Sequence, residues 1–211
     1  MSKNLFPILK EGFVYIGALL ALFIAFEALG LSALAFIAFI ALFLVIYIYK
    51  NPEREIQVYD SSAIVSPVDG VVKSINEYSS EDGAHFIITI ESSYLDTAVL
   101  RAPITASEYR CELTRGTRFC TSSKLFNKLN EVAHLEFKDG DKSLAVTHRL
   151  TKSFDDLSIY QRGAAISVGV RYGVMLCGVT EIKLDSSCRI GVSVGSKVYA
   201  SQTLLANFTH A

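Results

Sequence analysis

Charge is what this sequence lacks over most of its first quarter. Between Phe13 and Tyr49 the only charged residue is Glu27, and the rest of the run is apolar. A helix that is apolar on every side must be buried in protein or lipid, and about 20 such residues cross a bilayer. The run is longer than the apolar part of a signal peptide, and no small-residue cleavage site is evident. The sequence therefore predicts a membrane segment.

The apolar run is interrupted once, at the stretch "FEALGLSAL", which holds Glu27, Gly30 and Ser32. Splitting the run there leaves two segments, at about residues 13–29 and 31–49, each short but sufficient to cross the bilayer. We therefore predict a transmembrane hairpin. The alternative is one long tilted helix, which would carry the rest of the chain across the membrane.

Basic residues flank the predicted hairpin on both sides and are missing from its turn. Lys3 and Lys10 precede it, and Lys50 and Arg54 follow it. Because cytoplasmic flanks carry the excess of Lys and Arg, both ends are expected in the cytoplasm. We thus predict a membrane hairpin over 1–50 and a cytoplasmic domain over 51–211, attached to the cell membrane.

Cysteine is scarce, and its spacing excludes the common cysteine-based sites. Cys111, Cys120, Cys177 and Cys188 form no C-x-x-C pair and accompany no paired-histidine motif. Reduced thiols in a reducing compartment are the simplest reading, and we predict no metal site. The net charge is −1 and there is no run of Lys and Arg, so the basic field that nucleic-acid binding requires is also missing.

The remaining chain, residues 51–211, has the size of one domain and the pattern of a mainly β fold. Short alternating or β-branched segments are separated by glycine and turn residues. "SPVDGVV" predicts a tight turn between two strands at Asp69-Gly70, and "KDGDKS" predicts a hairpin turn at Asp139-Gly140. "TSSKLFNKLNEVAHL" is the one clear helix candidate, with Thr121 or Ser122 as its N-cap.

Two segments of this domain are weakly similar to each other. "IVSPVDGVVKSI" and "IGVSVGSKVYASQTLLANF" resemble the two halves of a barrel-sandwich hybrid, the fold of lipoyl and biotinyl carriers. A carrier also needs an exposed lysine at a hairpin tip, and no such tip lies at the matching place. The fold class expected is therefore a transmembrane α-helical hairpin plus a barrel-sandwich-hybrid-like β domain with one short helix.

Seven motifs, in order along the chain, carry a more specific resemblance. After the apolar hairpin come "NPER", "SPVDGVV", "LDTAVLRAPITA", "GTRF", "NE", "RYGVMLCG" and "VSVGSKVYASQTLLA". In this order they resemble the short, membrane-anchored form of phosphatidylserine decarboxylase over nearly the full length. The resemblance implies a serine after a glycine that cleaves its own chain and leaves a pyruvoyl group, the electron sink for decarboxylation. It also implies an Asp-x-His pair that supplies a base.

The chain departs from this family pattern at both catalytic positions. Aligned on "RYGVMLCG", the residue after Gly178 is Val179, which has no oxygen with which to attack a carbonyl. Aligned on "LDTAVLRAP", Asp96 is present as a remnant, but the histidine position is Ala98. We therefore expect no intact catalytic site, an uncleaved chain and no pyruvoyl cofactor. The hydroxyl of Thr180 lies one residue too late to make the same group.

Other family positions also differ. The family's Asn-Glu-Arg is Asn130-Glu131-Val132 here, and Asp155 and Asp156 stand where cations would be expected. Arg101 could bind a phosphate or pair with Asp96, and the residues leave both readings open. These two residues are the candidate phospholipid head-group contacts.

Three functions remain open at this point. The first is a degenerate, non-catalytic family member that binds membrane phospholipids or serves as a scaffold or partner subunit, as a homo-oligomer or with another membrane protein. The second is a working lyase that makes phosphatidylethanolamine. The third is a barrel-sandwich carrier or adaptor module.

Overall fold

The computed structural model describes residues 6–55, 60–80, 83–160 and 165–209. The chain divides into two compact units, Met1–Glu53 and Arg54–Ala211. We call the first the helical unit and the second the β domain.

The helical unit is a pair of apolar helices, α1 (Phe13–Ala28) and α2 (Ser32–Ile48), preceded by the 3-10 turn η1 (Lys10–Gly12). Gly30, with φ +70°, lies in the turn between the helices. Backbone hydrogen bonds join the segment before η1 to the segment after α2. Leu9 N–H donates to Tyr49 O at 2.9 Å, and Asn51 N–H donates to Pro7 O at 2.7 Å.

The outer surface of this unit is apolar, and no residue of α1 is buried. The apolar helix Lys10–Ala28 is long enough to cross a membrane, whereas α2 is slightly shorter than that standard. Such a surface is stable in lipid and not in water. Membrane anchoring by the N-terminal helix is therefore plausible on physical grounds, and the second pass and the cytoplasmic orientation stay predictions.

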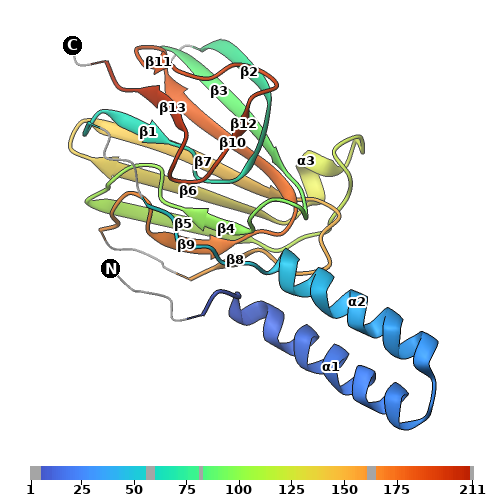
Figure 1. The fold of residues 1–211 in the computed structure, drawn as a ribbon. Helices are drawn as coiled ribbons and strands as arrows, with labels where there is room; N and C mark the ends of the chain where they lie inside the picture. Colours follow the sequence, from blue (N-terminus) through green and yellow to red (C-terminus); the bar gives the residue numbers. More distant parts are fainter. Residues whose placement is uncertain (1–5, 56–59, 81–82, 161–164, 210–211) are drawn as a thin grey trace. The chain divides into compact units, whose positions relative to one another are not determined.

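The β domain contains a seven-stranded antiparallel sheet in the order β12–β2–β3–β10–β7–β6–β5 (Figure 1). Its strands are β2 (Gly70–Ser80), β3 (Gly83–Ser92), β5 (Glu108–Thr114), β6 (Val132–Asp139), β7 (Lys142–Leu150), β10 (Gly178–Asp185) and β12 (Lys197–Val198). The alternating burial along β6 and β7 shows that one face of the sheet lies on the core.

Two three-stranded sheets complete the described part of the domain. One has the order β1–β13–β11, with β1 (Ala63–Val65), β11 (Arg189–Ile190) and β13 (Leu204–Asn207). The other has the order β4–β9–β8, with β4 (Val99–Arg101), β8 (Ser158–Ile159) and β9 (Arg171–Val174). The buried core of this described part is mainly aliphatic and contains three aromatic rings, of which Tyr109 contacts both Phe137 and Tyr172.

Two local expectations were wrong. The predicted helix over "TSSKLFNKLNEVAHL" shrinks to α3 (Phe126–Leu129), and neither Thr121 nor Ser122 caps it, since Leu125 holds the N-cap position. The residues after it pair as β6 with β7, because the alternation of Ala133, Leu135 and Phe137 buries one face of a strand.

The turn at Asp69-Gly70 also differs from expectation. β1 pairs with β13, and β2 pairs with β3 and β12, so the turn carries the chain from one sheet to another and closes no hairpin. The hairpin predicted at Asp139-Gly140 is confirmed, one residue later: Asp139 ends β6 and pairs with Lys142 of β7, so the turn residues are Gly140, with φ +59°, and Asp141.

Candidate functional site

The two positions where the family pattern is lost lie close to one residue, Met175. Gly178 begins β10, and a Cβ added to it would lie 2.5 Å from Met175 Sδ and 2.7 Å from Arg149 O. Ala98 precedes β4, and its carbonyl accepts a hydrogen bond of 2.8 Å from Met175 N–H. The fold therefore brings both positions to one buried residue, the Gly178 position at its side chain and Ala98 at its backbone, and the glycine at 178 is required by close packing.

The side chains at the two positions are buried and chemically inert. Val179 is 7% exposed and Ala98 is 3% exposed. Methyl groups can neither attack a carbonyl nor carry a proton. The continuous segment between β9 and β10 thus leads into a strand that pairs on both sides, with Gly178 paired to Ser92 of β3 and to Leu150 of β7.

Asp96 is held within a surface turn. Its Oδ2 accepts hydrogen bonds from the backbone N–H and the hydroxyl of Ser93, at 2.9 and 2.8 Å. Its Oδ1 lies 3.7 Å from Lys197 Nζ. The carboxylate therefore closes the Ser93–Asp96 turn and faces an exposed lysine.

Arg101 lies inside the domain. It is 4% exposed on β4, and its Nη1 donates to Gly169 O at 3.2 Å. A head-group contact by Arg101 would require the chain around Gly169 to move, whereas Lys197 beside Asp96 is accessible to a ligand from solvent.

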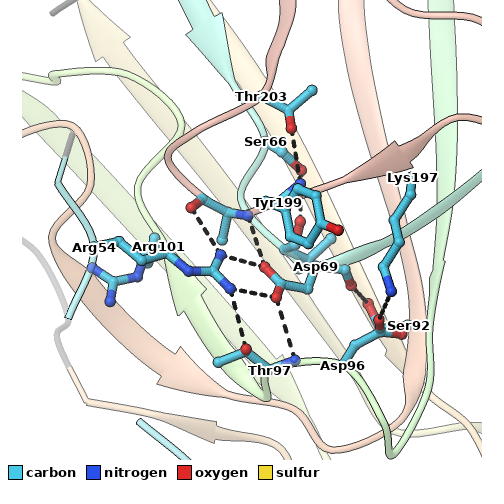
Figure 2. A network of polar contacts seen from close by, with 12 residues as sticks. Arg54, Ser66, Asp69, Ser92, Asp96, Thr97, Arg101, Lys197, Tyr199 and Thr203 are labelled. Atoms are coloured by element: carbon cyan, nitrogen blue, oxygen red, sulfur yellow. Dashed lines mark hydrogen bonds and ion pairs between the residues drawn. The ribbon is translucent and has the colours of Figure 1, made fainter. Parts of the chain in front are cut away.

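The strongest polar site is one that the sequence patterns did not single out, centred on Asp69 (Figure 2). Each Asp69 oxygen accepts a 2.5 Å hydrogen bond from Arg54, in a bidentate ion pair. The backbone N–H of Ala200 donates to the same carboxylate at 2.8 Å, and that of Thr97 is 3.4 Å away. Arg54 donates further to Ala200 O at 3.1 Å and to Thr97 Oγ1 at 3.2 Å.

Burial makes this ion pair energetically important. Only 10% of the Arg54 side chain and 4% of the Asp69 side chain are exposed. Burial alone would raise the pKa of Asp69, but the hydrogen bonds from Arg54 and Ala200, the Arg54 charge and Thr97 together hold that pKa below its usual value. Asp69 therefore stays ionised, and every strong contact it makes joins separate parts of the chain.

The surrounding sequence explains why Asp69 is directed inward. Ser66 Oγ donates to Val68 O at 2.7 Å, and Ser92 Oγ donates to Asp69 O at 2.5 Å. A Cβ at Gly70 would collide with the backbone of Glu91. Ser92 is also the β3 partner of Gly178. It therefore connects the Asp69 cluster to the glycine that precedes Val179.

A second buried polar group centres on His148. Its Nδ1 lies 2.8 Å from Thr180 Oγ1 and its Nε2 lies 2.6 Å from the Tyr172 hydroxyl. Burial lowers the pKa of His148 to about 3 and raises that of Tyr172 well above its usual value. The histidine is therefore neutral, and the Thr180 hydroxyl is already engaged with it.

Of the two acidic residues that stand where cations would be expected, Asp156 is neutralised from another loop, and the neighbouring Glu131 is paired as well. Arg118 forms an ion pair with Asp156, and Arg115 forms one with Glu131, whose carboxylate also accepts the Leu157 N–H. This stretch is thus a structural network. Within the ranges that the structure describes, no group of three or more His, Cys, Asp or Glu residues is placed to hold a metal ion, and the four cysteines are free.

The chain is similar to known proteins of one family. A family model described as phosphatidylserine decarboxylase matches residues 41–206. A phosphatidylserine decarboxylase proenzyme of Desulfotalea psychrophila is 26% identical, over 94% of this chain and 95% of its own length. The proenzymes of Symbiobacterium thermophilum and Geobacter metallireducens are each 27% identical, over 97% of this chain and 98% of theirs. No solved structure gives a significant match.

Proposed function

Because this chain belongs to the phosphatidylserine decarboxylase family, we propose that it is a membrane-anchored member that has lost the family's self-cleavage and lyase chemistry. It remains a single uncleaved chain on the cytoplasmic side of the inner membrane. There it binds phospholipid head groups or serves as a scaffold or partner subunit, alone as a homo-oligomer or with another membrane protein.

The observation that carries this proposal is Val179 after Gly178, supported by Ala98 near the same buried methionine. A pyruvoyl group is made from the residue after the glycine, and it needs an oxygen there. Val179 has no such oxygen and does not meet that requirement. The buried carboxylate of Asp69 is engaged by Arg54 and by backbone N–H groups.

The head-group part of the proposal rests on the exposed Lys197 and on Asp96 beside it, while Arg101 is buried elsewhere in the domain. An ammonium and a carboxylate 3.7 Å apart match the opposite charges of an aminophospholipid head group. The apolar helical unit keeps the β domain close to such lipids.

We also propose that the β domain contains a barrel-sandwich-type core. The two similar segments pair with each other twice: β1 with β13, and β2 with β12, where Val71 faces Lys197 and Gly70 faces Val198. Mutual pairing of two halves is the arrangement that this fold would produce. A carrier function has no further support here, since Lys142 at the β6–β7 turn is bound to Ser61 O at 2.9 Å.

A working lyase is the alternative that specific observations favour. The relatives named above are proenzymes that match nearly the whole chain, and Thr180 offers a hydroxyl beside a histidine. Against it, Thr180 is completely buried, lies within β10, and its attack would fall on the carbonyl of Val179.

Decarboxylation of phosphatidylserine distinguishes these functions. The full chain, in vesicles containing phosphatidylserine with a labelled carboxyl group, should release carbon dioxide at least about a thousandfold more slowly than the Desulfotalea relative, because loss of the nucleophile removes the covalent route. Phosphatidylethanolamine formation that depends on protein and disappears in Thr180→Val would instead establish the lyase.

A further inference from the structure

One face of the β domain exposes large apolar side chains between lysines. We call it the basic-apolar face. Its exposed apolar members are Leu95, Phe119, Leu125, Leu129 and Phe154. Its exposed basic members are Lys124, Lys128 and Lys152. Side chains such as Leu95, which is 67% exposed, cost free energy in water, and a cluster of them marks a binding surface.

The loop 118–129 supplies most of this face. Hydrogen bonds from Asn130 hold its two ends together. The Asn130 amide donates to Phe119 O at 2.7 Å and to Leu150 O at 2.8 Å, and it accepts from Phe119 N–H at 2.9 Å. Phe126 is buried beneath the loop. The Asn130 hydrogen bonds and the buried Phe126 hold the loop in place. Leu125 and Leu129 then point outward together, because residues four apart share one side of a helical turn.

Two neighbouring turns adjoin this loop. Lys152 N–H donates to Arg118 O at 3.1 Å, which joins the turn 151–156 to the loop. The Tyr94 hydroxyl donates to Lys152 O at 2.8 Å, and the Tyr94 and Phe154 rings stack at 5.4 Å. Leu95 follows directly on the same turn.

The loop 118–129 of this face carries charge of one sign. Residues 117–130 contain Arg118, Lys124 and Lys128 and no acidic residue. The adjoining turns add Lys152 and three carboxylates, of which Asp156 pairs with Arg118 and Asp96 lies 3.7 Å from Lys197, while Asp155 adds a further negative charge. Lysines around protruding leucine and phenylalanine side chains are the combination that binds an anionic lipid surface, where the lysines meet head groups and the apolar side chains enter the acyl boundary.

We propose that the basic-apolar face docks onto the anionic surface of the membrane. The inference rests on the membrane anchoring in the proposed function, but not on the loss of lyase chemistry. The chain itself keeps the β domain near the membrane, since only residues 49–53 separate α2 from Arg54 in the sequence. Arg54 in turn binds Thr97, two residues from Leu95, so a short tether enters the β domain beside this face.

Tryptophan fluorescence tests the proposal cleanly, because the chain contains no tryptophan. The full chain is placed in nanodiscs of phosphatidylglycerol and phosphatidylcholine with brominated acyl chains, which quench nearby indoles. The reporter is Leu125→Trp and the matched control is Tyr78→Trp, which is similarly exposed. Tyr78 pairs with His85, seven residues from Ser92 along β3, so it lies roughly 24 Å from that end of the strand.

Docking predicts that Leu125→Trp loses about half its fluorescence in these discs while Tyr78→Trp keeps nearly all of it, because only the former reaches the acyl boundary. Adding Lys124→Glu and Lys128→Glu should return the Leu125→Trp signal to the control level, and so should neutral phosphatidylcholine discs. Equal signals from the two reporters would overturn the docking. So would an emission shift of Leu125→Trp that depends on protein concentration in lipid-free detergent, which would assign the face to another chain.

Phe36→Trp, on an exposed position of α2, separates the two proposals. Quenching at 36 without quenching at 125 refutes the docking and leaves the anchor intact. Absence of quenching at 36 refutes the anchor, and the docking with it.

Discussion

Replacing Arg54 with alanine should lower the free energy of unfolding by about 3 kcal/mol, because removal of one partner leaves the buried Asp69 charge uncompensated. For a domain of this size, such a loss corresponds to a fall of roughly 6–12 °C in Tm. Thermal unfolding of the full chain in detergent, followed by circular dichroism, measures it. Asp69→Ala should cost a similar amount, and the double variant should cost clearly less than the sum.

An exposed ion pair provides the control. Arg110 contacts Glu108 at 2.6 Å, but both side chains are at least half exposed, so Arg110→Ala should change the unfolding free energy by under about 0.5 kcal/mol. The contribution of Asp69 to stability depends on pH, and the sign of that dependence follows from its pKa. The pKa of Asp69 is lowered in the folded chain, so its contribution is present above the unfolded pKa and is lost as pH falls through the lower, folded value. Equal effects of Arg54→Ala and Arg110→Ala would show that the Asp69 cluster does not hold the domain together.

Acid should destabilise the β domain through His148, beginning near pH 6.5. The pKa of His148 is about 3 in the folded chain, whereas an unfolded histidine binds a proton near pH 6.5. Between these values the unfolded chain takes up a proton that the folded chain cannot, so lowering the pH favours unfolding. Two pH units below 6.5 should therefore cost roughly 3 kcal/mol.

Denaturant titrations at pH 7 and pH 4.5 measure this dependence. His148→Gln should be less stable than the parent chain at pH 7, since it disturbs the contacts to Thr180 and Tyr172, but this part of the pH dependence should disappear. His134→Gln, at an exposed position on β6, should retain the full dependence. If His148→Gln loses stability with acid as steeply as the parent chain, the buried histidine is not the cause.

The sequence predicted those features that depend on local pattern. The apolar run indicated two helical segments, and α1 and α2 lie over them. Asp139-Gly140 predicted a hairpin because a two-residue turn and its flanking alternation are contiguous in sequence. The order of the family motifs located Gly178 and Ala98, which the fold brings close to Met175.

Features that depend on tertiary partners escaped prediction. The stretch before Asn130 reads as the start of a long helix, but the next strand gains more by pairing with β7 than by continuing the helix. Asp69 reads as a turn residue because its partners, Arg54 and Ala200, are remote in sequence. His148 reads as an isolated histidine for the same reason. A signal for Asp69 did exist, since both it and Arg54 lie within the family motifs.

An intact-mass measurement of the purified full chain tests the central claim most directly. We expect one species near the full 23.2 kDa, unchanged by borohydride or hydroxylamine. The reason is that Val179, the residue after Gly178, lacks the hydroxyl group that self-cleavage requires. Two fragments that meet beside Gly178, the smaller one carrying a ketone at its new N-terminus, would contradict the account and return the protein to the working decarboxylases.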